Sequence, residues 1–277
     1  MIAPAKLNLC LYLGPPREDG LHEICSLFHP LNLADRIEVG DADGPRDEVH
    51  CSGVEGPNLA ADALAALRDA GWDRPPIRVE IEKRIPIAAG LAGGSADAAA
   101  VLRLAAGAVG GIDAIAAELG ADVPSQLRPC FALVGGAGET VEPLPPTGEW
   151  AVVLIPAEEG LATAEVYAEA DRLGLCRGAD ELASIRERLL APAPGASPLD
   201  YAELLINDLG EAAISLRPAI GEALAALREA GAEHALVTGS GPTAAGLFRN
   251  IARADAAAVA LPYAYSSAIV TSPASLR

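Results

Sequence analysis

Apolar and polar residues alternate along several short segments of the first half of the chain, as they do in strands with one buried face. The predicted strands are 5–13 (AKLNLCLYL), 35–39 (DRIEV), 47–52 (DEVHCS), 77–83 (IRVEIEK) and a hairpin of 130–136 with 139–144. Elsewhere the apolar residues recur with the spacing of amphipathic helices. The predicted helices are 58–71, with Asn58 as N-cap, a segment that begins near Ser95, and 112–119.

The second half mixes short apolar strands with longer amphipathic helices. The predicted strands are 150–156, 233–239, 243–248 and 266–272, and the predicted helices are 162–173, 179–190, about 200–215, 218–230 and about 250–259. This order favours two α+β layers over a doubly wound parallel sheet. The proline-rich segment 143–148 (PLPPTG) marks a boundary between a domain over 1–145 and a second domain over 146–277.

Charge narrows the classes of partner. The net charge is −18, which repels the phosphate backbone of nucleic acids, so broad nucleic-acid binding is not expected. No apolar run approaches the ~20 residues that a membrane-spanning helix needs, and the N-terminus lacks the layout of a signal peptide. The five cysteines form no CxxC pair and are expected to be reduced. We therefore expect a cytoplasmic protein with a small-molecule ligand.

Lysine is rare in this chain. Only Lys6 and Lys83 accompany eighteen arginines. Where arginine is the usual cation, a lysine indicates a position that needs a compact point charge on a thin stem. The alternative is chance. Because both lysines flank the glycine-rich and strand motifs described below, the functional interpretation gains weight.

One histidine-containing segment invites a metal interpretation. Residues 22–29 read HEICSLFH, but the spacing is not that of HExxH, because the second histidine follows the first by seven positions. We therefore expect a segment of mixed strand and loop there rather than a metal site.

The stretch 86–100 reads PIAAGLAGGSADAAA. It is not a P-loop, because no lysine follows its glycines, and it is not a GxGxxG dinucleotide turn. A glycine-rich loop that leads into a helix near Ser95 exposes backbone N–H groups and the positive end of the helix dipole, which together suit an anion. A tight turn of small residues between a strand and a helix is an equally good interpretation of this stretch alone.

Two further motifs bear on the choice. VTGSGPT (237–243) is a second glycine-rich turn, in which Gly239 and Gly241 permit close backbone approach to a ligand; a simple hairpin turn is the alternative. LGADVPSQL (119–127) places Asp122 after a helix, where an aspartate is usually a cap. Paired with a lysine from the first strand, Asp122 could instead position and deprotonate a hydroxyl.

Taken together, PAKLNLCLYLG (4–14), PIAAGLAGGSADAAA (86–100) and VTGSGPTAAGLF (237–248) resemble, in order and spacing, the three motifs of the GHMP kinase superfamily. REDGLH (17–22), PNLAADAL (57–64), LGADVP (119–124) and NDL (207–209) narrow the resemblance to the branch that phosphorylates the 2-hydroxyl of a diphosphocytidyl methylerythritol in non-mevalonate isoprenoid synthesis. The resemblance implies an α+β, two-domain fold, with an N-terminal domain like ribosomal protein S5 domain 2 and a C-terminal ferredoxin-like domain.

The resemblance also implies site residues, with ATP and Mg²⁺ as cofactors. Lys6 and Asp122 match the catalytic pair. The positions that match the ATP site are Pro86, Ala88, Ala89, Gly90, Leu91, Ala92, Gly93, Gly94, Ser95, Ala96, Asn58 and Lys83. The positions that match the substrate site are Asn8, His22, Tyr167, Gly239, Ser240 and Gly241. The motifs do not fix the metal ligands; Ser95 is a candidate through Mg-ATP.

One position departs from the family pattern. An aromatic residue usually precedes the histidine that matches His22, and here the residue is Leu21, so the cytosine would have one aromatic wall, Tyr167, and one aliphatic wall. Two other interpretations stay open. The chain could be another GHMP small-molecule kinase, of the homoserine or mevalonate type, or a GHMP-like protein that binds a ligand without catalysis.

Overall fold

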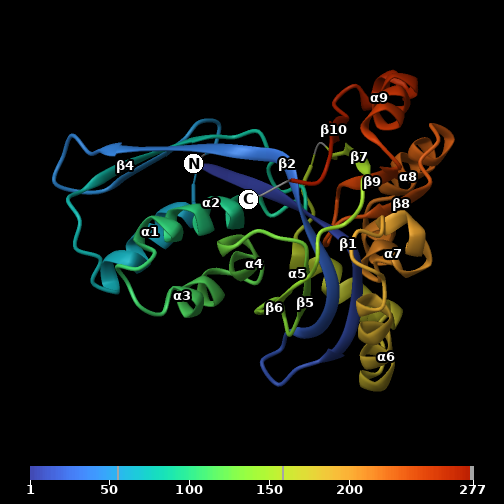
Figure 1. Cartoon of the computed structure of the whole chain (residues 1–277), viewed down its shortest axis with the longest axis horizontal. Coiled ribbons are helices and arrows are strands. Elements are labelled where there is room, and N and C mark those ends of the chain that lie inside the picture. Colours follow the sequence, from blue (N-terminus) through green and yellow to red (C-terminus); the bar gives the residue numbers. More distant parts are fainter. Residues whose placement is uncertain (55, 158, 275–277) are drawn as a thin grey trace.

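Two β-sheets, each covered by helices, organise the computed structural model (Figure 1), which describes residues 1–54, 56–157 and 159–274. The strands of the first sheet are β1 (Ile2–Pro16), β2 (His22–Asp41), β3 (Glu48–Cys51), β4 (Ile77–Glu82), β5 (Ala132–Gly135) and β6 (Thr140–Pro143). The sheet has the order β3-β4-β2-β5-β6, and β1 pairs with β2. Its pairs are antiparallel except for β3 with β4.

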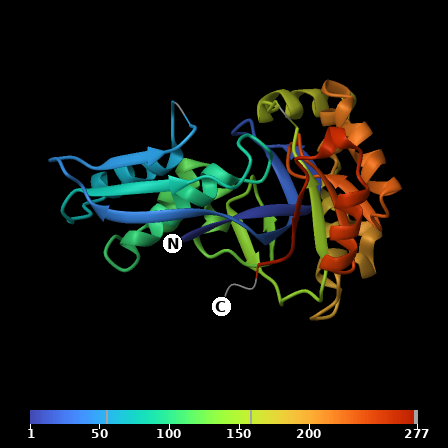
Figure 2. The ribbon, with the colours of Figure 1, turned by 90° about the horizontal axis from the view of Figure 1, so that it is seen from above.

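The second sheet has the order β10-β7-β9-β8 and is antiparallel throughout. Its strands are β7 (Ala151–Ile155), β8 (His234–Val237), β9 (Ala244–Phe248) and β10 (Ile269–Thr271). Figure 2 shows the long blue and cyan strands of the first sheet on one side of the molecule and the second sheet, with its orange and red helices, on the other.

The helices fall into two groups that follow the sheets. The first group is α1 (Leu59–Asp69), α2 (Gly93–Leu102), α3 (Ile112–Leu119) and α4 (Val123–Leu127). The second group is α5 (Thr163–Leu173), α6 (Ala179–Leu190), α7 (Leu209–Leu216), α8 (Ala219–Glu229) and α9 (Ile251–Ala260). The described residues also include three short 3-10 helices: η1 (Arg103–Ala105), η2 (Pro198–Leu204) and η3 (Tyr263–Tyr265). In the described part of the chain, no helix combines the length and apolar character needed to cross a bilayer.

The helices α1 to α4 pack on one face of the first sheet. Ile37 and Val79 from the strands meet Leu64 and Leu67 of α1 and the alanines of α2 in one buried cluster. The alanines explain the close approach, because α2 is buried along most of its length and its four fully buried alanines each project only a methyl group. This packing places the start of α2 at the inner end of the sheet.

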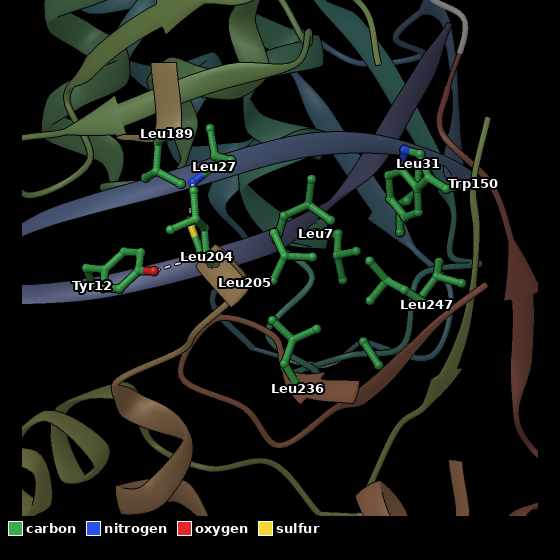
Figure 3. Packing of buried hydrophobic residues seen from close by; sticks show 14 of the residues in the cluster. Leu7, Tyr12, Leu27, Leu31, Trp150, Leu189, Leu204, Leu205, Leu236 and Leu247 are labelled. Carbon is green, nitrogen blue, oxygen red and sulfur yellow. Dashed lines mark hydrogen bonds between the residues drawn. The ribbon is translucent and has the colours of Figure 1, made fainter. Parts of the chain in front are cut away.

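A second buried cluster joins the two halves of the chain. Figure 3 shows Leu7 and Leu27 of the first sheet in contact with a group that includes Trp150, Leu236 and Leu247 from the second half. The Tyr12 hydroxyl, on β1, donates a hydrogen bond of 2.8 Å to the carbonyl oxygen of Leu204. This bond connects β1 to η2. The predicted boundary at 143–148 separates the two sheets, but this hydrophobic cluster extends across it.

The sequence interpretation of β2 was wrong. We expected mixed strand and loop over 22–29 and a separate strand over 35–39, whereas His22–Asp41 is one continuous strand. Residues 24–31 are buried on both faces of the sheet, between two hydrophobic clusters. A strand buried on both faces shows no alternation of apolar and polar residues, so the expected signal is absent.

The helix expected near 200–215 is also divided. η2 ends at Leu204 and α7 begins at Leu209. Between them, the Asn207 amide donates to the carbonyl oxygens of Val237 and Gly239, each at 2.7 Å. Asp208 accepts from the backbone N–H of Leu13 at 2.9 Å. These side chains bind the neighbouring segments, and the helix is interrupted at this point.

Candidate active site

A cavity of about 550 Å³ lies where the first strand, the glycine-rich loop and the second glycine turn meet. This volume is in the range of small-molecule sites. Among the residues proposed from the sequence, the lining includes Lys6, Asn8, Asn58, Lys83, Pro86, 88–95, Asp122, Tyr167, Gly239 and Ser240. His22, Ala96 and Gly241 are not in the lining. The cavity thus gathers most of the residues that the motifs indicated, from both halves of the chain.

The glycine-rich loop has a left-handed backbone at three positions. Gly90 has φ +72°, and Ala88 and Ala92 have φ +52° and +56°, a region that costs an alanine about 1–2 kcal/mol. The loop is held in place from the strand side, because Lys6 N–H donates to the carbonyl oxygen of Leu91 at 3.1 Å. Backbone strain that is held in this way is typical of functional loops.

The helix that follows the loop begins at Gly93, two residues earlier than expected. Ser95 is therefore not its N-cap. The N-cap is Ala92, which has no side chain to accept a hydrogen bond. The first N–H groups of α2 thus lie next to the cavity without a capping side chain, at the positive end of the helix dipole. This arrangement is suited to an anionic ligand.

Lys6 and Asp122 form the charged pair of the cavity. The Lys6 ammonium lies 3.4 Å from Asp122 Oδ2, and the lysine is only 4% exposed. It donates to Asn8 Oδ1 at 2.5 Å and lies 4.5 Å from the centre of the Phe28 ring. Asn8 in turn donates to Ser26 Oγ at 2.9 Å. The lysine is therefore fixed from several directions, while Asp122 remains one-third exposed towards the cavity.

Lys83 also lines the cavity, but its charge is compensated. Its ammonium donates to Asp35, which is fully buried, and to Asp97 Oδ2 at 2.8 Å. Burial opposes the ammonium form, but these two hydrogen bonds outweigh it and raise the pKa of Lys83. Burial raises the pKa of Asp97 to about 6, against the attraction of Lys83. The cluster of Asp35, Lys83 and Asp97 therefore offers no net positive charge to a phosphate.

The second glycine turn approaches the cavity through its backbone. A Cβ on Gly239 would lie 3.0 Å from the Gly90 carbonyl oxygen and 3.6 Å from Lys6 Nζ. Thr238 Oγ1 accepts from the Asn8 N–H at 3.0 Å, which joins this turn to the first strand. Ser240 Oγ lies 3.0 Å from Thr163 Oγ1 at the start of α5. Glycine is thus required where the two loops meet.

Tyr167 lines the cavity and packs against His22, which lies outside the lining. Their ring centres are 5.6 Å apart and tilted by 43°. Burial raises the pKa of Tyr167 to about 12, and the charge of Asp122 adds to this effect. His22 is buried behind Tyr167, and Leu21, where an aromatic was expected, is 53% exposed. Of Leu21, His22 and Tyr167, only Tyr167 lines the cavity, so Tyr167 supplies the aromatic face at this position.

Sequence reasoning missed several residues of the site. Asp35 was assigned only to a strand, and Phe28, Thr163 and Asn207 received no role. Asp35 lies 48 positions from Lys83 in the chain, so no local pattern connects them. The one available signal was an aspartate at the start of an otherwise alternating strand. A buried acid of this kind needs a cationic partner.

Comparisons with known proteins agree with this geometry. The model of the GHMP kinases N terminal domain matches residues 58–127, and that of the GHMP kinases C terminal region matches residues 198–267. The 4-diphosphocytidyl-2-C-methyl-D-erythritol kinase of Thermobifida fusca (strain YX) is 39% identical, over 93% of this chain and 89% of its own length. A crystal structure of 4-(cytidine 5'-diphospho)-2C-methyl-D-erythritol kinase superposes with a TM-score of 0.79 at 33% identity, covering 99% of each chain.

A more distant structure shares the fold alone. Mevalonate kinase of L. major, solved in complex with R-mevalonate, has a TM-score of 0.72 at 13% identity and covers 100% of this chain and 96% of its own. The chain therefore belongs to the GHMP kinases, in the family of the 4-diphosphocytidyl-2-C-methyl-D-erythritol kinases. The resemblance and the α+β GHMP kinase fold predicted from the sequence motifs are confirmed.

Proposed function

We propose that this chain transfers the γ-phosphoryl group of ATP to the 2-hydroxyl of 4-diphosphocytidyl-2-C-methyl-D-erythritol, a step of non-mevalonate isoprenoid precursor synthesis. The observation that carries the proposal is the pairing of buried Lys6 with cavity-facing Asp122, 3.4 Å apart, beside the uncapped start of α2. A kinase needs these two features together, because phosphoryl transfer depends mainly on alignment and on stabilisation of charge.

Asp122 is assigned the role of binding and deprotonating the acceptor hydroxyl. The carboxylate accepts a hydrogen bond from the hydroxyl, orients its oxygen towards the γ-phosphorus and takes the proton as the new P–O bond forms and ADP leaves. Lys6 holds the Asp122 carboxylate in place by electrostatic attraction, and the same ammonium stabilises negative charge on the phosphoryl oxygens. The buried position of Lys6 strengthens both effects, because water screens the charge less there.

The glycine-rich loop is assigned the role of binding the ATP phosphates. Residues 88–95 supply backbone N–H groups and the dipole of α2, and Asn58 and Lys83 would line the nucleotide end of the cavity. Asn58 also caps α1, because its Oδ1 accepts from Ala60 N–H at 2.9 Å. Since the charge of Lys83 is compensated by Asp35 and Asp97, we assign Lys83 to the shape of this pocket rather than to direct phosphate neutralisation.

Mg²⁺ would enter with ATP. The Ser95 hydroxyl lines the cavity in the first turn of α2 and is an oxygen ligand of the type that Mg²⁺ accepts. When bound, the ion would neutralise charge on the phosphates that Lys83 leaves uncompensated. Ser95 would hold it together with phosphate oxygens and water, in keeping with the few protein ligands that Mg²⁺ usually takes in kinases.

The acceptor substrate is assigned to the opposite end of the cavity. Tyr167 would stack on the cytosine, with His22 against it, while Asn8, Gly239 and Ser240 would border the polyol and phosphates. Exposed Leu21 leaves the second face of the base with an aliphatic contact at most. The free cysteines suit the reducing cytoplasm, where ATP is abundant, and we place the reaction there.

A substrate panel tests the proposal. The protein is incubated with Mg-ATP and, separately, with the diphosphocytidyl alcohol, mevalonate, homoserine or galactose, and ADP release is followed. We expect ADP with the diphosphocytidyl alcohol alone. Faster turnover of mevalonate or homoserine would show a different GHMP kinase, and ADP release with none of the four would favour a ligand-binding protein.

A further inference from the structure

Three side chains with metal-binding atoms meet beside the cavity, behind Tyr167. His22 begins β2, Asp171 lies on α5, and Cys176 follows that helix. One nitrogen of His22, a carboxylate oxygen of Asp171 and the sulfur of Cys176 all lie within 4.8 Å of one another. In the part of the chain that the structure describes, this is the one group of three such residues with donor atoms this close.

The hydrogen bonds of His22 define which nitrogen faces the group. Nδ1 lies 3.2 Å from the Gly14 carbonyl oxygen, which can only accept, so Nδ1 carries a hydrogen. Nε2 lies 3.2 Å from Asp171 Oδ1 and 3.3 Å from Oδ2. A backbone carbonyl that holds one imidazole nitrogen, so that the other faces a carboxylate, is the usual arrangement around a metal-bound histidine.

Cys176 completes the set. Its sulfur lies 3.4 Å from Asp171 Oδ1. It also lies 3.7 Å from His22 Nδ1, the nitrogen that donates to Gly14, and it belongs to the set of donor atoms within 4.8 Å of one another. The three residues offer nitrogen, oxygen and sulfur, a mixture that Zn²⁺ accepts in tetrahedral sites. The thiolate is the form that coordinates Zn²⁺, so the Cys176 thiol gives up its proton when the metal binds.

We propose that His22, Asp171 and Cys176 form a site for one Zn²⁺ ion at the base end of the cavity. His22 Nε2, an Asp171 oxygen and the Cys176 thiolate supply three ligands. His22 is buried but Asp171 is about half exposed, so the fourth position is open to water and the ion reaches the site from solvent. Binding releases the thiol proton to the buffer.

Occupation of the site has a kinetic consequence, which rests on the proposed function. His22 is held against Tyr167, the residue assigned to stack on the cytosine. A metal at Nε2 fixes the imidazole and places a cation at that end of the cavity, so Zn²⁺ is expected to raise the KM for the diphosphocytidyl substrate. The KM for ATP, which the proposed function assigns to the glycine-rich loop, is expected to stay the same.

The binding test uses the whole purified protein with Zn²⁺ alone, by calorimetry and competition with a chromogenic chelator. We expect one ion per chain with a Kd of about 1 µM or below. Cys176→Ser and Asp171→Asn are each expected to weaken binding by about 10-fold or more. Cys130→Ser and Asp180→Asn, which change a cysteine and an aspartate outside the group, are expected to bind like the parent.

Cobalt gives a direct view of the sulfur. Co²⁺ bound at this site is expected to show a thiolate-to-metal absorption band that Cys176→Ser abolishes and Cys130→Ser retains. Weak or multiple binding that Cys176→Ser leaves unchanged would overturn the site. If Zn²⁺ binds as expected but leaves the KM for the diphosphocytidyl substrate unchanged, the kinetic consequence is wrong and the metal site stands. Failure of the substrate panel would leave the binding test unaffected.

Discussion

A Cβ atom on Gly90 would lie 2.7 Å from the carbonyl oxygen of Gly241. The same atom would lie 2.8 Å from the Thr238 carbonyl oxygen. The two glycine-rich segments, which come from different halves of the chain, therefore touch through their backbones. Neither carbonyl belongs to a flexible side chain, so a methyl group at Gly90 has to displace one of the two loops.

Gly90→Ala is expected to lower kcat/KM for ATP by about 100-fold, because a shift of about 1 Å in the phosphate loop misaligns the transfer. Gly107→Ala is the matched control. Gly107 has φ +80°, similar to the +72° of Gly90, but its Cβ would meet nothing within 4 Å. Both variants bear the same conformational cost of about 1–2 kcal/mol. Steady-state kinetics that show equal losses in the two variants would refute the role of the contact.

Lys6→Arg is expected to lower kcat by about 100-fold or more while ATP binding stays within a few-fold of the parent. The ammonium occupies a slot between Asn8 Oδ1, Asp122 and the Phe28 ring, with 4% of the residue exposed. The broader guanidinium has no room to reach the same point. Turnover assays measure kcat, and calorimetry with an ATP analogue measures ATP binding. Near-normal turnover would show that the site does not need the compact ammonium of a lysine.

Asp122→Asn is expected to fold normally and to lose about 10²–10⁴-fold in kcat. Its side chain caps no N–H of α4 and is one-third exposed, so the fold depends little on it. Asp113→Asn is the control, since Asp113 forms an exposed ion pair with Arg128 at 2.7 Å and lies outside the cavity. A rate for Asp122→Asn within a few-fold of the parent would end its assignment as proton acceptor.

Asp35→Ala is expected to lower the free energy of unfolding by about 3–5 kcal/mol, the cost of breaking a buried ion pair. Asp35 accepts a hydrogen bond from the Lys83 ammonium. It also accepts from the backbone N–H of Arg84 at 2.6 Å and from that of Ile85 at 2.9 Å. Asp41→Ala changes an exposed aspartate at the end of the same strand and should cost little. Urea denaturation compares the two, and similar midpoints would show that the buried cluster adds no stability.

His29 should give the unfolding free energy a pH dependence. Burial lowers its pKa to about 4, against the hydrogen bond to Pro30, whereas an unfolded histidine has a pKa of 6.5. Between these values the unfolded chain binds the extra proton, so stability is full above pH 6.5 and falls by up to about 3 kcal/mol as the pH drops to 4.

The His29→Phe variant checks this assignment. Phenylalanine keeps the stacking with Phe131, whose ring centre lies 5.1 Å from that of His29, but cannot take up a proton. The variant should lose less stability between pH 7 and pH 4.5 than the parent does, as measured by denaturant titration at each pH. An identical loss in both proteins would show that other groups cause the acid sensitivity.

The helices and the alternating strands could be predicted because the spacing of apolar and polar residues within each one indicates which side is buried. The alternating strand over 77–83 and the helix over 58–71, with Asn58 as its cap, are confirmed. The strand over 150–156, a short uninterrupted apolar run, is confirmed as well. β2 could not be predicted as one strand, because its inner part is buried on both faces and its pattern lacks alternation. The pairing of Lys83 with Asp35 depends on strand register, which no local pattern encodes.

The hydrophobic cluster that contains Leu7, Leu27, Trp150, Leu236 and Leu247 constrains how this chain can change. A fragment that ended at residue 145 would expose its inner leucines to water, and so would the remaining piece, so neither should survive alone as a stable product of limited proteolysis. Exchange of halves with a distant relative would bring together inner surfaces that had never been selected to fit. The two halves of the gene are therefore expected to have been inherited as a unit.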